Sequence, residues 1–480
     1  LGAGAAARIR LADVSGDLIL DVVAPSPLAQ GATLSSGLIY MWLGGGTLTG
    51  AKAQDATLGV TAPALGDALA AGAAGRVLVG DVNNDAIADV IGRRRDAGGI
   101  YVWYGGAGLV GASPEDALLT VPSPTAGDRL GSGGTRLADL TGDGILDIVS
   151  SAPLTDVGGV FDVGAVHVWA GGVALAGPLS PFASLRVAGS IDDRLSYEAK
   201  EITFASRFGD VTGDSALDIV VPAFRADIAG TADVGAVYVW RGGGTMTGTP
   251  APAATLLGPG SVFGDMVGLS SGANVALADV SGDGRFDVVA AASAADIGSA
   301  LNAGAIYMWR GGATLTGTLT PTATMRDASP NSNDLLAGGL TEGVAWDLAD
   351  VNADSVRDVI AIAPQSDTVA GANAGAGFYW AGGAALVGNR TQTAEFLAPA
   401  ASSGDLLGAS GGTVDLLFPV DVTDDGLADV LIGASSYTGS GPSERGGLFL
   451  WQGGGGLTGT PSTTANLLAP TPVALDRLGN

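Results

Sequence analysis

The chain has 480 residues, including 79 Gly and no Cys, and carries a formal net charge of −26 at pH 7. With 47% hydrophobic and 15% charged residues, this composition excludes a disordered chain, and the lack of Cys excludes disulfides and thiolate metal sites. The acidity argues against nucleic acid and anionic membranes as partners, because their phosphates bind clustered Lys and Arg. Gly, Pro or Asp interrupts every long apolar run, so no membrane insertion is predicted.

An Asp-rich loop of the form D-x-[STN]-x-D-x-x-x-D recurs seven times, at intervals of 58 to 71 residues. In each repeat an apolar stretch enters the loop and a β-branched run leaves it. A segment like G-A-[VI]-Y-[VM]-W-x-G-G and a last apolar stretch near a proline follow. Four short strands per repeat predict an all-β fold, a seven-bladed β-propeller with four antiparallel strands per blade. An open solenoid of stacked sheets has the same local pattern, but seven units favour a closed ring.

The regular spacing leaves no room for a second domain. We therefore expect one propeller domain over residues 1–480. Its approximate blades are 1–62, 63–125, 126–191, 192–260, 261–331, 332–402 and 403–480.

Positions 1, 3, 5 and 9 of every loop carry a side-chain oxygen. Because a tight turn can point alternate residues inward, we expect positions 1, 3 and 5 to converge with a backbone carbonyl near position 7. Such a flexible cage of hard oxygen ligands suits Ca²⁺ better than Mg²⁺. Three carboxylates within nine residues repel one another strongly without a cation. We therefore predict up to seven Ca²⁺ ions, with the ligands Asp13, Ser15, Asp17, Asp21, Asp81, Asn83, Asp85, Asp89, Asp139, Thr141, Asp143, Asp147, Asp210, Thr212, Asp214, Asp218, Asp279, Ser281, Asp283, Asp287, Asp350, Asn352, Asp354, Asp358, Asp421, Thr423, Asp425 and Asp429.

The alternative for these loops is that the Asp residues form Asx turns at a hairpin. Seven copies that keep the same three Asp favour metal binding over this alternative. Gly144, Gly284 and Gly426 stand at position 6 of the third, fifth and seventh loops, where Gly eases a sharp turn. We expect these three loops to be the strongest calcium sites.

The Asp loop and the Trp segment, in this fixed order, resemble the FG-GAP repeats of integrin α-subunit propellers and their bacterial relatives. The resemblance covers all seven repeats. It implies a seven-bladed ring with calcium in the hairpin between the first two strands of a blade, and an extracellular adhesion role. Two features depart from the family: position 3 is Ser or Thr in five loops, and every blade carries a loop, whereas integrin propellers carry loops in only some blades.

Seven of the eight Trp recur at one repeat position, two residues after an aromatic residue or His167. We expect these rings to pack between blades, since large aromatic residues bury the most area, with a sugar-binding platform as the alternative. The connection before the Trp strand holds an acidic pair at i and i+6, as in Asp156 with Asp162. We expect the pair to shape this loop, with extra cation binding as the alternative.

Two irregularities interrupt the repeat: an insertion at Ile191–Ser206 and the basic cluster Arg93–Arg95. We expect both to be solvated loops, and contact surfaces are the alternative. Catalysis has little support, because the single His167 sits at a core position and a Ser-His-Asp arrangement lacks a base.

The leading hypothesis is a non-enzymatic, extracellular or cell-surface module, stabilised by calcium, that binds a protein or glycan ligand. One alternative is a structural subunit that self-associates into a surface filament or layer. The other is a polysaccharide-active, lyase-like enzyme that uses Tyr197 or Lys200 of the insertion.

Overall fold

A computed structural model describes residues 9–29, 36–46, 48–62, 68–70, 77–94, 99–121, 127–132, 134–173, 175–196, 206–260, 262–270, 275–338, 344–409, 417–439, 444–469 and 478. These residues form 32 β-strands and a single 3-10 turn, Gly243–Thr245. None of the helices found in this part of the chain could cross a membrane. The chain divides into two compact units. Unit 1 comprises Leu1–Phe208, Ala216–Val221 and Trp240–Pro252, and unit 2 comprises Gly209–Ser215, Pro222–Val239 and Ala253–Asn480.

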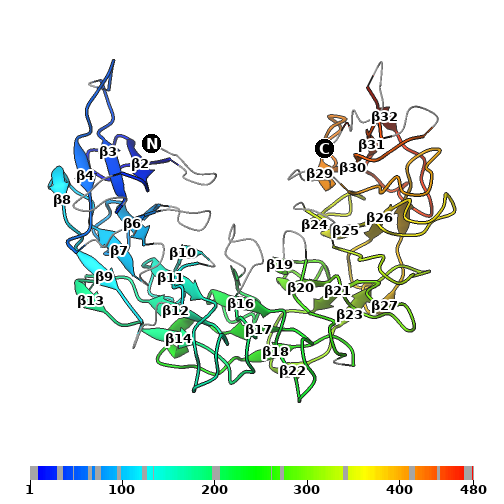
Figure 1. Ribbon diagram of the computed structural model, residues 1–480, viewed down its shortest axis with the longest axis horizontal. Coiled ribbons are helices and arrows are strands. Elements are labelled where there is room, and N and C mark those ends of the chain that lie inside the picture. The colour runs from blue at the N-terminus through cyan, green and yellow to red at the C-terminus, as the bar shows by residue number, and fades with distance from the viewer. Residues whose placement is uncertain are drawn as a thin grey trace. The chain divides into compact units, whose positions relative to one another are not determined.

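Three of the seven sheets belong to unit 1, and Figure 1 labels most of their strands, which run from blue to blue-green. The division between the units falls among the residues of the fourth sheet. The first sheet has the order β1-β2-β3-β4-β8, with bounds Arg10–Ala12, Asp21–Ser26, Leu38–Trp42, Ala56–Leu58 and Gly111–Ser113. The second has the order β13-β9-β7-β6-β5, with bounds Gly177–Leu179, Ala117–Leu119, Ile100–Trp103, Asp89–Arg93 and Leu78–Gly80. The third has the order β10-β11-β12-β14, with bounds Thr135–Ala138, Asp147–Ala152, Ala165–Trp169 and Ala183–Leu185. The fourth has the order β15-β16-β17-β18-β22, with bounds Arg207–Gly209, Asp218–Ala223, Ala236–Trp240, Ala254–Leu256 and Gly317–Leu319.

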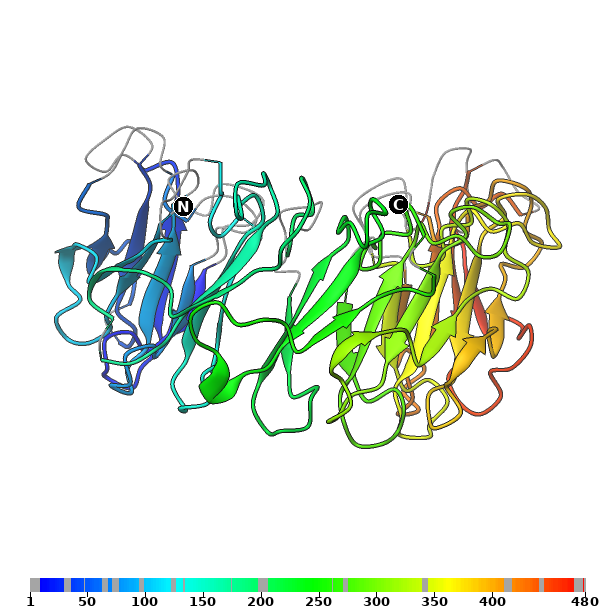
Figure 2. The ribbon, with the colours of Figure 1, turned by 90° about the horizontal axis from the view of Figure 1, so that it is seen from below.

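The other three sheets belong to unit 2, and Figure 2 shows their strands, yellow-green to orange, side by side. The fifth sheet has the order β19-β20-β21-β23-β27, with bounds Val275–Ala278, Asp287–Ala292, Ala305–Trp309, Ala323–Met325 and Gly388–Arg390. The sixth has the order β24-β25-β26-β28, with bounds Trp346–Ala349, Asp358–Ala363, Ala376–Trp380 and Ala394–Phe396. The seventh has the order β29-β30-β31-β32, with bounds Leu417–Val420, Asp429–Ala434, Gly447–Trp451 and Ala465–Leu467. The prediction of an all-β fold built from seven repeated sheets is confirmed.

One register recurs between the second and third strands of the repeats. The residue after the position 9 Asp stands opposite the Trp, in the pairs Val22–Trp42, Val90–Trp103, Ile148–Trp169, Val288–Trp309, Val359–Trp380 and Val430–Trp451. Because the strands are antiparallel, the Asp at position 9 comes level with the residues that follow the Trp. This register brings the Asp loop to the W-x-G-G segment of its own sheet.

The recurrent Trp side chains lie in the core. Six of them are at most 1% exposed, and these are Trp103, Trp169, Trp240, Trp309, Trp380 and Trp451. The ring centroids of Tyr307 and Trp309 are 6.0 Å apart, and the indole N–H of Trp309 donates to the Leu319 carbonyl at 3.3 Å. Burial therefore confirms the packing prediction for these six rings and excludes them as an exposed platform for sugars, whereas Trp42 is half-buried.

Successive sheets within each unit are joined by one repeated hydrogen bond. The N–H of the second Gly of W-x-G-G in one sheet donates to the carbonyl of position 2 in the Asp loop of the sheet before it, over 2.6 to 2.8 Å. The pairs are Gly106–Val14, Gly172–Val82, Gly243–Leu140, Gly312–Val211, Gly383–Val280 and Gly454–Val351. A short parallel pairing accompanies this bond, as between β23 and β27. Six of the position 2 side chains are fully buried, whereas Val422 in the last sheet of unit 2 is 49% exposed. Covering by a following sheet therefore buries position 2.

The acidic pairs shape their loops as predicted. Asp156 Oδ1 accepts the N–H of Asp162 at 3.1 Å, and Asp227 Oδ1 accepts that of Asp233 at 3.0 Å. The prediction of a solvated Arg93–Arg95 cluster is wrong for Arg93, which is 6% exposed at the end of β6. Its side chain packs on Gly131, where a Cβ would meet Arg93 Cδ, so the absence of a side chain there makes room for it. Arg95 lies outside the described residues, as do Tyr197, Glu198, Lys200 and Glu201 of the insertion.

Candidate metal loops

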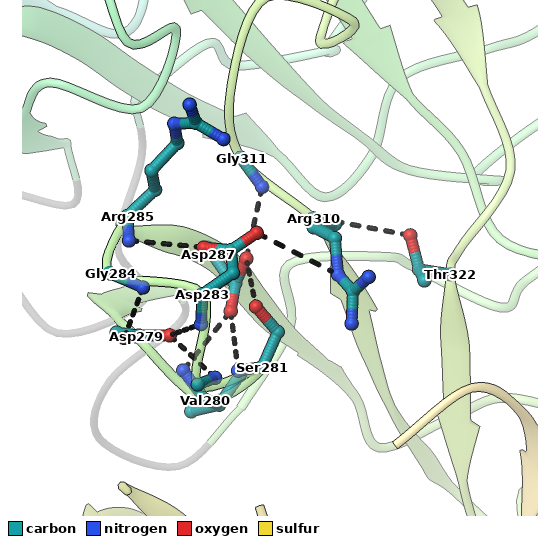
Figure 3. A network of polar contacts seen from close by, with 11 residues as sticks. Asp279, Val280, Ser281, Asp283, Gly284, Arg285, Asp287, Arg310, Gly311 and Thr322 are labelled. Atoms are coloured by element: carbon teal, nitrogen blue, oxygen red, sulfur yellow. Dashed lines mark hydrogen bonds and ion pairs between the residues drawn. The ribbon is translucent and has the colours of Figure 1, made fainter. Parts of the chain in front are cut away.

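The Asp at position 1 holds each loop in a tight turn. In the fifth loop, Asp279 Oδ1 accepts the N–H groups of Gly282 at 2.7 Å and Asp283 at 3.1 Å, and Oδ2 accepts that of Gly284 at 2.8 Å (Figure 3). The bonds to positions 5 and 6 recur in all seven loops, with Asp13, Asp81, Asp139, Asp210, Asp350 and Asp421 as the other acceptors. Asx-type turns are therefore present in every loop.

The turn needs left-handed backbone at positions 4 and 6. In the fifth loop Gly282 and Gly284 supply it, with φ of 71° and 82°. Asn84 and Ala86 take the same conformation in the second loop, with φ of 67° and 66°. All seven loops therefore fold alike, and Gly at position 6 lowers the strain of a turn that other residues also adopt.

The Asp at position 9 is buried and fully bonded to backbone. Asp287 is 0% exposed, and its Oδ2 accepts the N–H groups of Val280 at 3.0 Å and Ser281 at 2.8 Å. Its Oδ1 accepts the N–H of Gly311, the first Gly of W-x-G-G, at 3.0 Å. The same bond, over 2.9 to 3.2 Å, joins Asp21–Gly44, Asp89–Gly105, Asp147–Gly171, Asp218–Gly242, Asp358–Gly382 and Asp429–Gly453. Position 9 thus fixes the loop to the third strand of its own sheet.

In the sixth loop, oxygens of positions 5 and 9 converge on one side-chain amide. Asn352 Nδ2 lies 3.0 Å from Asp354 Oδ2, 3.3 Å from Asp358 Oδ1 and 3.0 Å from the Tyr379 hydroxyl. The nitrogen and oxygen of an Asn amide are assigned from its hydrogen bonds. As it stands, Asn352 Oδ1 accepts the N–H of Asp354 at 2.8 Å, so a half-turn of the amide would give up that bond and place its oxygen beside the two carboxylate oxygens, a donor set that suits Ca²⁺.

The second loop repeats this arrangement. Asn83 Nδ2 lies 3.1 Å from Asp85 Oδ2 and 3.5 Å from Asp89 Oδ1. In the third, fifth and seventh loops the hydroxyl at position 3 approaches Oδ1 of position 9 instead, at 3.4 Å from Thr141 to Asp147, whereas Ser15 of the first loop donates to Asp13 Oδ1 at position 1, at 3.4 Å. In the second and sixth loops, side chains at positions 3, 5 and 9 therefore face one another.

Burial and the crowding of carboxylates both act on position 9. Burial, helped by the charges of Asp85 and Asp81, raises the pKa of Asp89 to about 6. Burial likewise raises the pKa of Asp358 to about 6, with Asp354 and Asp350 adding to the shift. Burial also raises the pKa of Asp147 and of Asp287. At Asp89 and Asp358 the charges of neighbouring carboxylates therefore add to the effect of burial.

The predicted ligand set is met only in part. Positions 3, 5 and 9 lie together, whereas both oxygens of position 1 point at backbone N–H groups. Across the described ranges, no three Asp, Glu or His side chains gather into a group that could hold a metal ion. The seven calcium sites therefore stay a prediction.

Two side chains near the loops were not predicted from the sequence. Gln452 Nε2 donates to Asp425 Oδ2 at 2.8 Å, and Arg310 Nε lies 4.0 Å from Asp283 Oδ2. Both residues directly follow the recurrent Trp. The strand register would have pointed to them, because it brings position 9 level with the residues after the Trp.

The single histidine is an unsuitable general base. Burial, with a contribution from Arg186, lowers the pKa of His167 to about 4. Its Nδ1 lies 3.0 Å from Ser184 Oγ, and the residue is 4% exposed. His167 is therefore neutral at pH 7 and enclosed in the third sheet.

No protein-family model and no curated protein matches this chain. Among solved structures, the chain is similar to the Dos1 propeller at 9% identity, covering 99% of this chain and 90% of that chain with a TM-score of 0.39. It is similar to an Agrocybe aegerita lectin that recognises non-reducing terminal N-acetylglucosamine, at 19% identity, covering 79% and 78% with a TM-score of 0.36. It is similar to rhamnogalacturonan lyase YesW at 10% identity, covering 82% of this chain and 61% of that chain with a TM-score of 0.38.

Proposed function

We propose that the Asp loops bind Ca²⁺ and that the bound ions stabilise the sheets. The observation that carries this proposal is the convergence of Asp354 Oδ2 and Asp358 Oδ1 on the amide of Asn352. The amide supplies a partial positive charge at that point. A divalent cation supplies far more, and it would neutralise Asp358, whose pKa is raised by burial and by the charges of Asp354 and Asp350.

The seven sheets are, in this proposal, the blades of one FG-GAP-type propeller. The repeated Asp loop, the constant strand register and the recurrent joint between successive sheets in each unit support it. Single-particle images of the purified chain test it. Seven lobes around one axis are expected, and an extended stack of sheets would contradict a closed ring.

The chain acts, on the same proposal, as an extracellular, non-enzymatic module that binds a protein or glycan. Its support is the enclosed and neutral His167 and the use of the Asp loops to hold the sheets. A bound ligand would contact surface loops, since the loops of a rigid β-scaffold carry most binding functions.

Arrays of glycans and of extracellular-matrix proteins, probed in Ca²⁺ and in EDTA, test this role. Saturable binding that needs Ca²⁺ supports the module. Polymers that form without any ligand would favour a self-associating subunit, and release of unsaturated sugars from pectic polysaccharide would favour a lyase.

A further inference from the structure

Arg310 faces the fifth Asp loop from the segment after the Trp strand. Its backbone N–H donates to Thr322 Oγ1 at 3.1 Å, which fixes where the side chain begins. Its Nε lies 4.0 Å from Asp283 Oδ2, with the two side chains 37% and 28% exposed (Figure 3). This Nε is buried, and within the described part of the chain it has no hydrogen-bond partner. The buried N–H therefore lies at ion-pair distance from the position 5 carboxylate.

In the sixth and seventh loops the group that faces position 5 is neutral, unlike the charged guanidinium of Arg310. Asp425 Oδ2 accepts from the amide of Gln452 at 2.8 Å, and Asp354 Oδ2 accepts from the amide of Asn352 at 3.0 Å. An amide is neutral and carries an oxygen that can turn toward a cation. The guanidinium of Arg310 has donors only and keeps its positive charge at every pH in the physiological range.

We propose that Arg310 is a built-in counter-cation that weakens calcium binding at the fifth loop. This inference rests on the proposed function of the Asp loops. A Ca²⁺ ion that uses Asp283 must displace the guanidinium or bind beside a like charge, and both oppose binding. Gly284 at position 6 therefore does not make this loop one of the strongest. The fifth loop becomes the weakest of the three loops that carry Gly there.

The third blade supplies a natural contrast at the same repeat position. Ala170 follows Trp169 as Arg310 follows Trp309, and the third loop also has Gly at position 6. Arg241 holds this position in the fourth blade.

A reciprocal exchange tests the inference. Arg310→Ala gives the fifth blade the residue of the third, and Ala170→Arg gives the third blade the residue of the fifth. Calcium bound per chain is measured by elemental analysis after dialysis against buffered free Ca²⁺, and the affinities by calorimetry. We expect Arg310→Ala to tighten one site about 5- to 10-fold, the order for one partly exposed charge. Ala170→Arg should weaken one site by a similar factor.

The control removes the same charge elsewhere. Arg326 follows β23, next to the residue paired with Ile306 at the far end of β21 from Trp309. Arg326→Ala should leave every calcium affinity as in the wild type. If it tightens a site as much as Arg310→Ala does, net charge explains the effect and the inference is overturned. Arg310→Gln, which keeps a long side chain, replaces Arg310→Ala if that variant fails to fold.

The inference and the proposed function fail in different ways. If the wild type binds no calcium, the proposed function fails and the inference fails with it. If the wild type binds calcium while both members of the exchange keep wild-type affinities, only the inference about Arg310 is overturned. Calcium located by anomalous scattering in crystals of the wild type should be weaker at Asp283 than at Asp143.

Discussion

The carboxylate of Asp287 accepts the backbone N–H of Gly311, 24 residues further along the chain, at 3.0 Å. A carboxylate with no exposed surface thus joins the start of one strand to the end of the next. Gly at position 311 is required by close approach, because a Cβ there would come 2.0 Å from the Phe286 carbonyl oxygen. The pair explains why every repeat keeps both the ninth Asp and the first Gly of W-x-G-G.

Asp287→Ala should destabilise the chain in calcium-free buffer by roughly 3 kcal/mol or more. The substitution leaves the buried N–H groups of Val280, Ser281 and Gly311 without their acceptor, at about 1–3 kcal/mol for each unsatisfied group. Urea unfolding measures the loss. Asp283→Ala is the control in the same loop, since Asp283 accepts one N–H at an exposed site, and it should cost less than about 1 kcal/mol. Equal costs for the two variants would refute the structural role of position 9.

Gly311→Ala should cost more than Gly284→Ala. The first places a Cβ against backbone, whereas the second has open space and only a left-handed φ of 82° to tolerate. We expect about 1 kcal/mol for Gly284→Ala and a clearly larger loss for Gly311→Ala, both in calcium-free buffer. Thermal unfolding of the two variants compares them directly. The reverse order would mean that the close approach of Gly311 to Phe286 does not hold.

Calcium removal should lower the melting temperature. A ligand that binds only the folded chain adds about 2.7 kcal/mol per site at a free concentration 100 times its Kd. The melting temperature should therefore rise steadily over a series of increasing buffered Ca²⁺ concentrations, and EDTA should reverse the rise. Mg²⁺ at the same concentrations is the control, because its strict octahedral geometry suits these loops poorly. Identical curves in Ca²⁺ and EDTA would remove the calcium proposal.

Asn352→Asp should have opposite effects with and without calcium. Without calcium it removes a donor shared by Asp354, Asp358 and Tyr379, and it adds a fourth carboxylate to the loop, so stability should fall by about 1–3 kcal/mol. With calcium the added carboxylate becomes a ligand, and affinity at this loop should rise. Melting temperatures in EDTA and in Ca²⁺ give the comparison. A loss of the same size in both buffers would place the metal elsewhere.

Asp334 should make the chain less stable as the pH rises from about 4 to about 6. Burial, opposed by the N–H of Asn331 and helped by the charges of Asp327 and Asp367, raises the pKa of Asp334 to about 6. The folded chain therefore holds a proton that the unfolded chain has already lost, so deprotonation through this window favours unfolding. Asp334→Asn should reduce the fall in stability across this window, measured by urea unfolding at several pH values. An unchanged slope would exclude Asp334 as its source.

Much of the fold was predictable because its causes are local. Turn residues at fixed offsets and β-branched runs indicated where the strands lie, and the repetition of this pattern indicated seven sheets. The Trp positions were predictable as core because a side chain that recurs in every repeat fits a packing role. Arg93 was misjudged, since its burial depends on the bare backbone of Gly131, which nothing in the local pattern indicates.

The candidate metal loops were likewise predictable only in their local features. The sequence by itself determined which residues bear oxygen, the positions 1, 3, 5 and 9, because their spacing is a local property of the chain. Only the tertiary structure decided where those oxygens point. The oxygens of position 1 accept N–H groups of their own loop, and position 9 accepts the N–H of a glycine as far as 24 residues away. Arg310 lies beside Asp283. Those contacts depend on strand register and on groups remote in the chain, and the energy of each hydrogen bond or charge pair depends on that placement.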